Sequence, residues 1–598
     1  MHNIAIDISK EISAGSRGFS VKMKKSGRER VSIDMNIPVR GHVPRFIDRG
    51  PLVLASVGHL YARSANSFDV EKSLSLLADA YLEAGIEGTR KAIGGGMFAL
   101  FVLDRARGRM HVIGDFLSCM PIYYRPIPDG FLLGINQFDL SDGIMPGVGA
   151  CAEYLAYGYL PFHDSLFPET SRLAPGQLLS LDLANPSAVS VTGETLPTYP
   201  ALAERIGDEN EAVDRMDALF TAYFSRLGDE RLAAGLSGGY DSRLIAAYCR
   251  DKPISFVTFD NPRTHEARNA RAVAATLGRQ TRVFGIPDDA PSRYADDLVY
   301  GASTSDSLES GHMFANLAVL MDSGPEYLID GHIGDVIFGG GWYYKLKNRT
   351  EPLGRILLGL DEYLDPPQGD ETYLRRLKTG YGRRIRGLGG NLDSVVDTES
   401  DAGLRGMIAT VRPHCETDAD ISELLLHRFR GAPLTSGGPV SFMRLVPTLS
   451  PFYDVGVFEA CMGLSKKLRA GDRVYNAFYR RRFPELARLP KENTGGNATQ
   501  SVTAYRLTHL TTSGARKLVS RLPRWMKSGG AAGGNLDGFQ RSYLANGDNL
   551  SFFGEVNRRN RDRLAAIGIP PATETEISDA PILALRRVSL GLLLEGRP

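Results

Sequence analysis

From about residue 210 onwards the sequence alternates between strand patterns and helix patterns, and this alternation limits the possible folds more than any other feature. Short strand patterns occupy 231–236, 253–260, 280–286 and 326–329, and amphipathic helical patterns occupy 210–228, 241–251 and 265–278. Strands that alternate with helices form parallel sheets, because each helix returns the chain to the same sheet edge. The sequence therefore predicts a doubly wound α/β unit, followed after about residue 350 by a mostly helical part.

The first two hundred residues follow a different pattern. Short runs of β-branched and aromatic residues are bounded by Gly, Pro and Asp, and helical stretches interrupt them at about 70–92 and 150–158. We therefore expect an α+β layered sandwich with antiparallel sheets over 1–200 and an α/β domain over 210–598. The Pro-bearing segment 193–205 is interpreted as the linker. The basic and then Gly-rich segment 517–538 is interpreted either as a mobile loop or as a solvated connector.

The overall charge excludes some classes of function. Lys plus Arg number 70 and Asp plus Glu number 69, which gives a net charge of +1 and argues against a general nucleic-acid or membrane-surface binder. The five cysteines are far apart and form no CxxC pair, which suits a reducing cytoplasm. We find neither a signal-peptide pattern nor a long uncharged apolar run, so the sequence predicts a cytoplasmic protein without a membrane span.

The string S-G-G-Y-D-S at 237–242 follows the first of these strands and opens a helix. Gly238 and Gly239 allow backbone N–H groups to approach an anion, and the helix start favours phosphate. Ser237 and Ser242 can donate hydroxyl hydrogen bonds to phosphate oxygens. Asp241 fits such a site only through a divalent cation, since carboxylate and phosphate repel each other. The alternative is an ordinary helix N-cap, which explains Asp241 alone better than it explains the whole string.

A second loop of the same kind follows a later strand. The sequence "DGHIGDVIFGGG" (330–341) ends a strand with glycines and supplies Asp335. Two carboxylates, Asp241 and Asp335, delivered to one sheet edge can hold one Mg²⁺ on a pyrophosphate. Asp330 is interpreted either as part of this site or as a simple turn residue.

These motifs resemble the asparagine synthetase family. The string at 237–242 is similar to its pyrophosphate-binding loop, "GHIGDVIFGG" to its second Gly/Asp loop, and "LSPFYD" (449–454) to a later Pro-Phe-x-Asp stretch. "GHLYAR", "GGMFALFVLD" and "GDFLSCMPIYY" resemble its glutamine-amidotransferase-type N-terminal domain. The resemblance implies an ATP-pyrophosphatase-type synthetase domain with ATP and Mg²⁺ as cofactors. The nucleotide-binding residues that it implies are Leu236, Ser237, Gly238, Gly239, Asp241, Ser242, Val257, Asp330 and Gly331.

The sequence departs from this family at the expected glutaminase nucleophile. Such an enzyme needs Cys directly after the initiator Met, where this sequence has His2, and the nearest cysteine is Cys119. An imidazole cannot form the thioester that a thiolate forms, so we expect no glutamine hydrolysis. Two branches of the family have lost this cysteine: β-lactam synthetases and lasso peptide cyclases. In both, ATP adenylates a carboxylate, pyrophosphate leaves, and an amine already on the substrate attacks the acyl-adenylate.

Three further positions are candidates for roles in this chemistry. His332 stands where the family has Glu, or Tyr in the β-lactam branch, and could accept the proton of the attacking amine or simply hydrogen-bond the loop backbone. Lys491 is the candidate for the lysine that steadies the transition state, with an exposed lysine at a helix end as the alternative. Arg243 is expected to contact phosphate, to pair with Asp335 or to face solvent.

The sequence therefore favours an ATP-dependent amide ligase that closes a lactam, with lasso peptide cyclization as the first hypothesis. The predicted catalytic residues are His332, Lys491, Asp241 and Asp335. The predicted partners are a precursor core peptide or a small amino-carboxylate, and in the first case a leader-cleaving protease and a leader-binding protein, but no nucleic acid and no membrane. The alternatives are a β-lactam synthetase-like or other small-molecule amidating enzyme, and a non-catalytic scaffold that binds nucleotide or peptide.

Overall fold

The structure is a computed structural model. It describes residues 5–13, 20–25, 30–38, 43–128, 130–141, 143–185, 189–193, 204–259, 266–301, 303–305, 307–338, 371, 385–491, 495–501, 504, 507–508, 511, 543–570 and 581–595. The predicted linker 193–205 falls largely outside these residues, and His2 and segment 517–538 fall entirely outside them.

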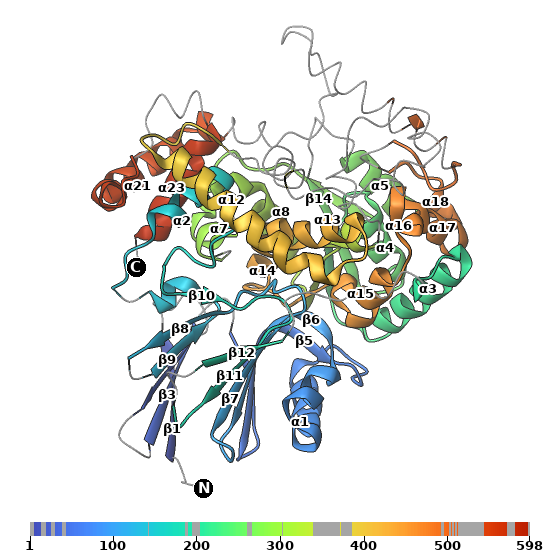
Figure 1. The fold of residues 1–598 in the computed structure, drawn as a ribbon. Helices are drawn as coiled ribbons and strands as arrows, with labels where there is room; N and C mark the ends of the chain where they lie inside the picture. Colours follow the sequence, from blue (N-terminus) through green and yellow to red (C-terminus); the bar gives the residue numbers. More distant parts are fainter. Residues whose placement is uncertain are drawn as a thin grey trace.

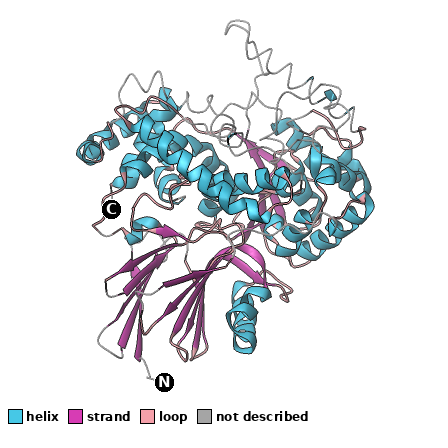
Figure 2. Ribbon diagram, viewed as in Figure 1, coloured by secondary structure: helices cyan, strands magenta, loops and turns pink. Residues whose placement is uncertain are grey.

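Two six-stranded sheets face each other in the N-terminal part (Figures 1 and 2). The first sheet has the order β1 (Ala5–Ser13), β3 (Arg30–Pro38), β2 (Ser20–Lys25), β9 (Gly130–Gly134), β8 (Tyr123–Ile127) and β10 (Ser171–Arg172). The second has the order β12 (Val189–Thr192), β11 (Leu178–Asp182), β7 (Arg109–Gly114), β6 (Ile93–Asp104), β5 (Leu52–Ala62) and β4 (Arg45–Asp48). The pairs are antiparallel as expected, except that β1 pairs with β3 in parallel.

The period-two pattern of the strands explains this layering. Along β5, Val53, Ala55 and Val57 belong to the main hydrophobic core, which includes inward-facing residues of the opposite sheet. The alternate residues Leu52 and Leu54 pack instead in a separate cluster with helix α1 (Val70–Ala92). The strand is therefore buried on both faces, by the other sheet and by α1.

A five-stranded parallel sheet forms the centre of the second part. Its order is β15 (Thr281–Phe284), β14 (Ile254–Phe259), β13 (Leu232–Gly235), β16 (Tyr327–Ile329) and β17 (Thr448–Leu449). The chain moves outwards from β13 to β15 and then returns to add β16 on the other side of β13. This reversal creates a topological switch point between the carboxyl ends of β13 and β16, the position where open α/β sheets bind ligands. The predicted doubly wound sheet is confirmed.

Helices cover this sheet and form most of the described chain after residue 385 (Figure 1). The helices that accompany the strands are α3 (Glu209–Phe224), α4 (Tyr240–Tyr248), α5 (Glu266–Thr276), α6 (Ala290–Arg293), α7 (Ala295–Gly301), α8 (Gly311–Met321) and α9 (Gly334–Ile337). The later helices are α12 (Leu392–Val411), α13 (Asp418–Leu426), a π-helical stretch (His427–Thr435), α14 (Gly437–Phe442), α15 (Val455–Met462), α16 (Lys466–Arg469), α17 (Arg473–Arg482), α18 (Pro484–Ala487), α21 (Gly547–Ala566) and α23 (Pro581–Leu594). The helix α2 (Val148–Tyr157) packs against α12 and α23.

The two parts share one continuous hydrophobic core. At their junction the hydroxyl of Tyr61 on β5 donates to Asp454 Oδ2 at 2.6 Å, just before α15. Gly95 on β6 forms a β-bridge with the same Asp454. The β-sandwich is thus attached directly to the segment that follows β17.

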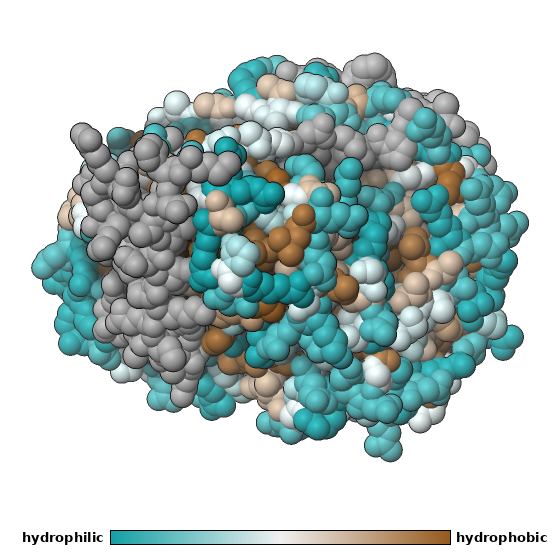
Figure 3. Space-filling model, turned by 90° about the horizontal axis from the view of Figure 1, so that it is seen from below, coloured by the Kyte–Doolittle hydropathy of each residue, from teal (hydrophilic) through white to brown (hydrophobic). Residues whose placement is uncertain are grey.

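The surface agrees with the balanced composition. Figure 3 shows one face on which hydrophobic residues lie in small separate groups among hydrophilic ones. In the described part of the chain, no helix combines the length and the apolar character needed to cross a bilayer.

Candidate functional site

The string S-G-G-Y-D-S forms a tight turn between β13 and α4. Gly238 has a φ of +79°, and a Cβ at this position would lie 2.6 Å from Cβ of Asn269. Ser237 Oγ accepts a hydrogen bond from the backbone N–H of Gly239 at 3.1 Å and lies 3.1 Å from Ser242 Oγ. Both hydroxyls and the start of α4 are therefore held at the carboxyl edge of the sheet, as a phosphate-binding loop requires.

The loop after β16 meets this turn. The backbone N–H of Asp335, in the first turn of α9, donates to Asp241 Oδ2 at 2.9 Å across 94 residues of sequence. Two glycines make this approach possible: a Cβ on Gly331 would lie 2.8 Å from Cβ of Asp241, and a Cβ on Gly334 would lie 2.6 Å from its Cγ. The two predicted loops thus lie together at the switch point of the sheet.

Asp241 carries an unfavourable charge in this setting. Burial and the nearby carboxylate of Asp335 raise the pKa of Asp241 well above its usual range, although the hydroxyl of Tyr475 donates a hydrogen bond to Oδ1. Asp335 itself is exposed. A divalent cation between the two carboxylates would remove this repulsion, so the donor set fits Mg²⁺. The described residues contain no cluster of three or more ligating side chains, so phosphate oxygens and water would complete such a shell.

Lys491 lies against the same loop. Its Nζ donates to Asp472 Oδ2 at 2.7 Å and lies 4.6 Å from the centroid of the Tyr240 ring. Burial lowers the pKa of Lys491, but the carboxylate of Asp472 outweighs this effect and the net pKa is raised. Its side chain is only 13 % exposed, so the alternative of an exposed lysine is wrong. The positive charge interacts with Asp241, which suits the predicted role.

His332 and Asp330 occupy the turn between β16 and α9. The Asp330 carboxylate accepts a hydrogen bond from the backbone N–H of His332 at 3.1 Å, and burial raises the pKa of Asp330 to about 6. The His332 ring stacks on Tyr453, with ring centroids 6.0 Å apart, and its Nε2 has no hydrogen-bond partner among the described residues. Burial lowers the pKa of His332 to about 4, so the ring is neutral at pH 7 and a weaker proton acceptor than free imidazole.

The residues predicted to contact adenosine lie at adjacent strand ends. Leu236 follows β13, and its backbone N–H donates to the carbonyl of Val257 on β14 at 2.8 Å. Both side chains are buried in the core. They stand beside the glycine turn, where a nucleotide bound to that turn could reach them through backbone groups.

Arg243 does not face solvent, contrary to one of the expected alternatives. It is fully buried on α4, and its guanidinium donates to the carbonyls of Leu486, Leu489 and Pro490 at 2.9–3.2 Å and to that of Gly238 at 2.8 Å. These bonds attach the glycine turn to the segment that precedes Lys491. The guanidinium therefore holds these two segments together, a role that the position of Arg243 in the motif did not indicate.

Sequence reasoning missed three residues of this site. Tyr475 donates its hydroxyl to Asp241, Asp472 fixes Lys491, and Tyr453 stacks on His332. Asp472 adopts a left-handed conformation with a φ of +58°. Tyr453 lies inside the quoted "LSPFYD" stretch, but Tyr475 and Asp472 lie in a helical region that gives no local signal of their proximity to the loop.

Part of the chain matches a known protein family. Residues 217–494 match the asparagine synthase family. No curated protein gives a significant match. Among solved structures, the chain is similar to NH3-dependent NAD synthetase from Campylobacter jejuni (16% identity, 33% of this chain and 95% of that chain, TM-score 0.18). It is also similar to NAD+ synthetase from Burkholderia pseudomallei (18% identity, 34% and 89%, TM-score 0.18) and to glutamine PRPP amidotransferase from B. subtilis (11% identity, 40% and 63%, TM-score 0.18).

With TM-scores this low, the assignment depends on the family match and on the site itself. The matched region contains the parallel sheet, both loops and Lys491. This region is similar to the asparagine synthase family, and the protein is an ATP-dependent carbon–nitrogen ligase that forms AMP and pyrophosphate.

Proposed function

We propose that this ligase closes a lactam within its own substrate, and that the substrate is a precursor core peptide whose N-terminal amine is joined to an Asp or Glu side chain, as in lasso peptide cyclases. ATP and Mg²⁺ are the proposed cofactors. The proposed location is the cytoplasm, and the proposed partners are a leader-cleaving protease and a leader-binding protein.

In this mechanism the residues of the two loops have distinct tasks. The backbone N–H groups at 238–242 and the hydroxyls of Ser237 and Ser242 bind the pyrophosphate portion of ATP. Asp241 and Asp335 would hold Mg²⁺, which when bound would supply positive charge to offset that of the pyrophosphate. A carboxylate oxygen of the substrate attacks the α-phosphorus and pyrophosphate leaves. The substrate amine then attacks the acyl carbon, loses a proton and displaces AMP, while Lys491 stabilizes the negative charge near the reacting phosphate.

The burial of the cysteines is the observation that favours a lactam, because it bears on where the amine comes from. A glutaminase needs an accessible thiolate. Four of the five cysteines in this sequence are buried and Cys415 is partly buried. Burial raises the pKa of Cys151, Cys249, Cys415 and Cys461 to about 12 and that of Cys119 well above its usual range. None of them is suited to release ammonia from glutamine, so an amine on the substrate itself is the simplest source.

The N-terminal sandwich then has no glutaminase role in the proposal. We assign 1–200 to an amidotransferase-like domain without that activity and 210–598 to the amide-forming domain. His332 remains the candidate general base. Because its pKa is low, a group of the substrate or a solvent molecule is an equally suitable proton acceptor.

The proposal is tested by incubating the purified protein with ATP, Mg²⁺ and a leader-cleaved precursor peptide. The expected result is release of AMP together with loss of one water from the peptide, in mass spectrometry. An Asp335→Asn variant provides the matched inactive control. If a small amino diacid were converted while no peptide changed, the substrate would be a small amino-carboxylate instead of a peptide. Amidation that depended on added ammonia would contradict the lactam proposal.

A further inference from the structure

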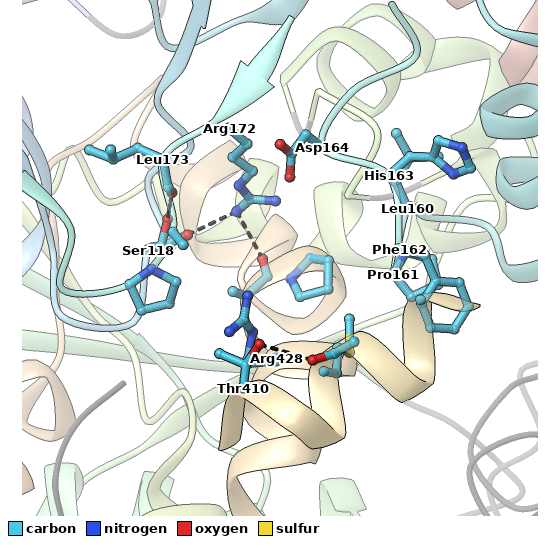
Figure 4. Close-up of a pocket in the computed structure, with 17 residues that line it drawn as sticks. Ser118, Leu160, Pro161, Phe162, His163, Asp164, Arg172, Leu173, Thr410 and Arg428 are labelled. Carbon is cyan, nitrogen blue, oxygen red and sulfur yellow. Dashed lines mark hydrogen bonds between the residues drawn. The ribbon is translucent and has the colours of Figure 1, made fainter. Parts of the chain in front are cut away.

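A cavity separate from the two loops lies where the N-terminal sandwich meets the later helices. Its volume is about 260 Å³. One wall is formed by the segment 160–164 and by β10 with the residues after it, and the other by α12 and the π-helical stretch. Figure 4 shows Arg172 and Arg428 extending into it from opposite walls, with Asp164 beside Arg172.

Arg172 is held in place but keeps free donors. Its Nη2 donates to the carbonyl of Ser118 at 2.8 Å and more weakly to that of Ala432 at 3.4 Å. We find no hydrogen bond from its Nη1 or Nε within the described part of the chain. A fixed guanidinium with free N–H groups costs little conformational entropy when it binds a carboxylate.

Arg428 is the less usual of the two. It is only partly exposed, and we find no hydrogen bond or ion pair for it among the described residues, its Nη1 being buried without an acceptor. Burial lowers the pKa of Arg428, and the charge of Asp164 offsets this only in part. Proteins rarely leave an arginine uncompensated, and such a group is costly unless a ligand provides the missing anion.

The charged side chains and the lining of the cavity indicate the chemical class of its ligand. The two guanidinium groups and the exposed carboxylate of Asp164 sum to one positive charge, which one carboxylate balances and a phosphate dianion would exceed. Beside its polar groups, the cavity has an apolar part, to which Leu160, Phe162, Leu173, Met407 and Pro433 belong. We propose that this cavity binds a carboxylate carried on an apolar group, held by Arg172 and Arg428. The proposal does not depend on the ATP chemistry of the two loops.

The test measures binding to the full chain by calorimetry, without ATP. The probe N-acetyl-L-leucine should bind at least ten-fold more tightly than N-acetyl-L-leucinamide, which lacks the charge, and more tightly than inorganic phosphate. Comparison with N-acetyl-Ala-Ala-Leu distinguishes the two sources of the carboxylate. Tighter binding of the peptide indicates a peptide C-terminus, and equal binding indicates a small organic acid.

Two substitutions at Arg428 test whether this residue causes the preference for the acid over the amide. Arg428→Met should abolish the preference for the acid without lowering Tm, since it removes a buried charge that Asp164 offsets only in part, and Arg428→Gln serves as a second variant. Arg405→Gln is the matched control, because Arg405 lies on α12 but makes an exposed ion pair with Glu371. Equal binding of acid and amide by the wild-type protein, or an unchanged preference in both Arg428 variants, would overturn the proposal.

Discussion

Asp241 shows how a functional demand can oppose stability at a single residue. It is partly buried and near a second carboxylate, yet it accepts hydrogen bonds from the backbone of Asp335 and the hydroxyl of Tyr475. Asparagine keeps an acceptor and removes the repulsion. We expect Asp241→Asn to lower ATP–pyrophosphate exchange at least 100-fold while unfolding stability stays equal or rises by about 1 kcal/mol.

The exchange assay and a thermal melt measure the two effects. Asp251→Asn is the control, since this exposed aspartate pairs at the surface with its neighbour Arg250. Wild-type exchange in Asp241→Asn would contradict a role of this carboxylate in the proposed metal site, and a large loss of stability would show that its charge is structural.

Gly334 allows a second prediction at this scale. An added methyl group would lie 2.5 Å from the ring of Phe452 and 2.6 Å from Cγ of Asp241. We expect Gly334→Ala to destabilize the protein by about 1–3 kcal/mol and to reduce exchange, because the two loops must separate. Gly554→Ala in α21, where an added Cβ would meet no atom of the described chain within 4 Å, should be neutral or stabilizing in the same denaturant titration.

The sequence could predict only some of these residues. The two aspartates and the glycines stand in short strings directly after strands, so local order predicts where they meet. Lys491 came from a resemblance, and its burial depends on Asp472 and Tyr240, which are distant in sequence. One alternative for Arg243, exposure to solvent, was wrong. Its carbonyl acceptors at 486–490 are distant in sequence and become its neighbours only after α17 and α18 have packed.

At the scale of elements, a buried ionic cluster supports the second loop. Glu423 on α13 pairs with Lys466 and Arg469 of α16, and Arg469 also donates to the carbonyl of Val336, next to Asp335, at 3.1 Å. Asp420 joins the cluster through Arg205 at 3.0 Å and Lys466 at 3.2 Å. The helix α9 is thus attached to α13 and α16 through paired charges.

This cluster should make stability depend on pH. Burial opposes the charge of Glu423, but Arg469 and Lys466 outweigh it and hold the pKa of Glu423 far below its usual range. A depressed pKa contributes stability above the unfolded value, near 4.3, and this contribution is lost as pH falls further. Glu423→Gln should cost about 3–5 kcal/mol at pH 7, and the difference from wild type should shrink below about pH 4.

Denaturant titrations at several pH values check this expectation. Glu555→Gln is the control, since Glu555 pairs with Arg559 at the surface and should show little effect at any pH. A difference that grows in acid would mean that the carboxylate is protonated in the native protein.

The elements themselves were largely predictable. The strand and helix periods gave the parallel sheet, the helix at 70–92 and the approximate position of the helix at 150–158, which the structure places at Val148–Tyr157. The parallel pairing of β1 with β3 was not predicted, because side-chain alternation is the same in parallel and antiparallel pairs. Sequence period therefore predicts the type of element better than the direction of its neighbour.

At the scale of the whole molecule, the sandwich and the ligase part are joined by buried polar contacts. Asp454 accepts from Tyr61 and also caps α15 by accepting from the backbone N–H of Val457 at 2.9 Å. We expect Tyr61→Phe to destabilize the whole chain by about 1.5–3 kcal/mol, because a buried hydrogen bond to a carboxylate is lost.

Calorimetry of the full chain measures this effect. Tyr327→Phe is the control, since among the described residues that hydroxyl has just one hydrogen bond, a long one of 3.4 Å to the carbonyl of Phe68. Destabilization confined to one of two separate transitions would show that the parts unfold independently.

The reversal of the chain between β13 and β16 has a consequence for motion. The loops that follow these strands come from segments 94 residues apart in sequence, and the backbone N–H of Asp335 joins them by donating to Asp241. A bound nucleotide that contacts both loops would therefore hold them together. Amide deuterium uptake should slow at both loops simultaneously when Mg²⁺ and a non-hydrolysable ATP analogue are added, whereas the outer faces of the β-sandwich should exchange as before.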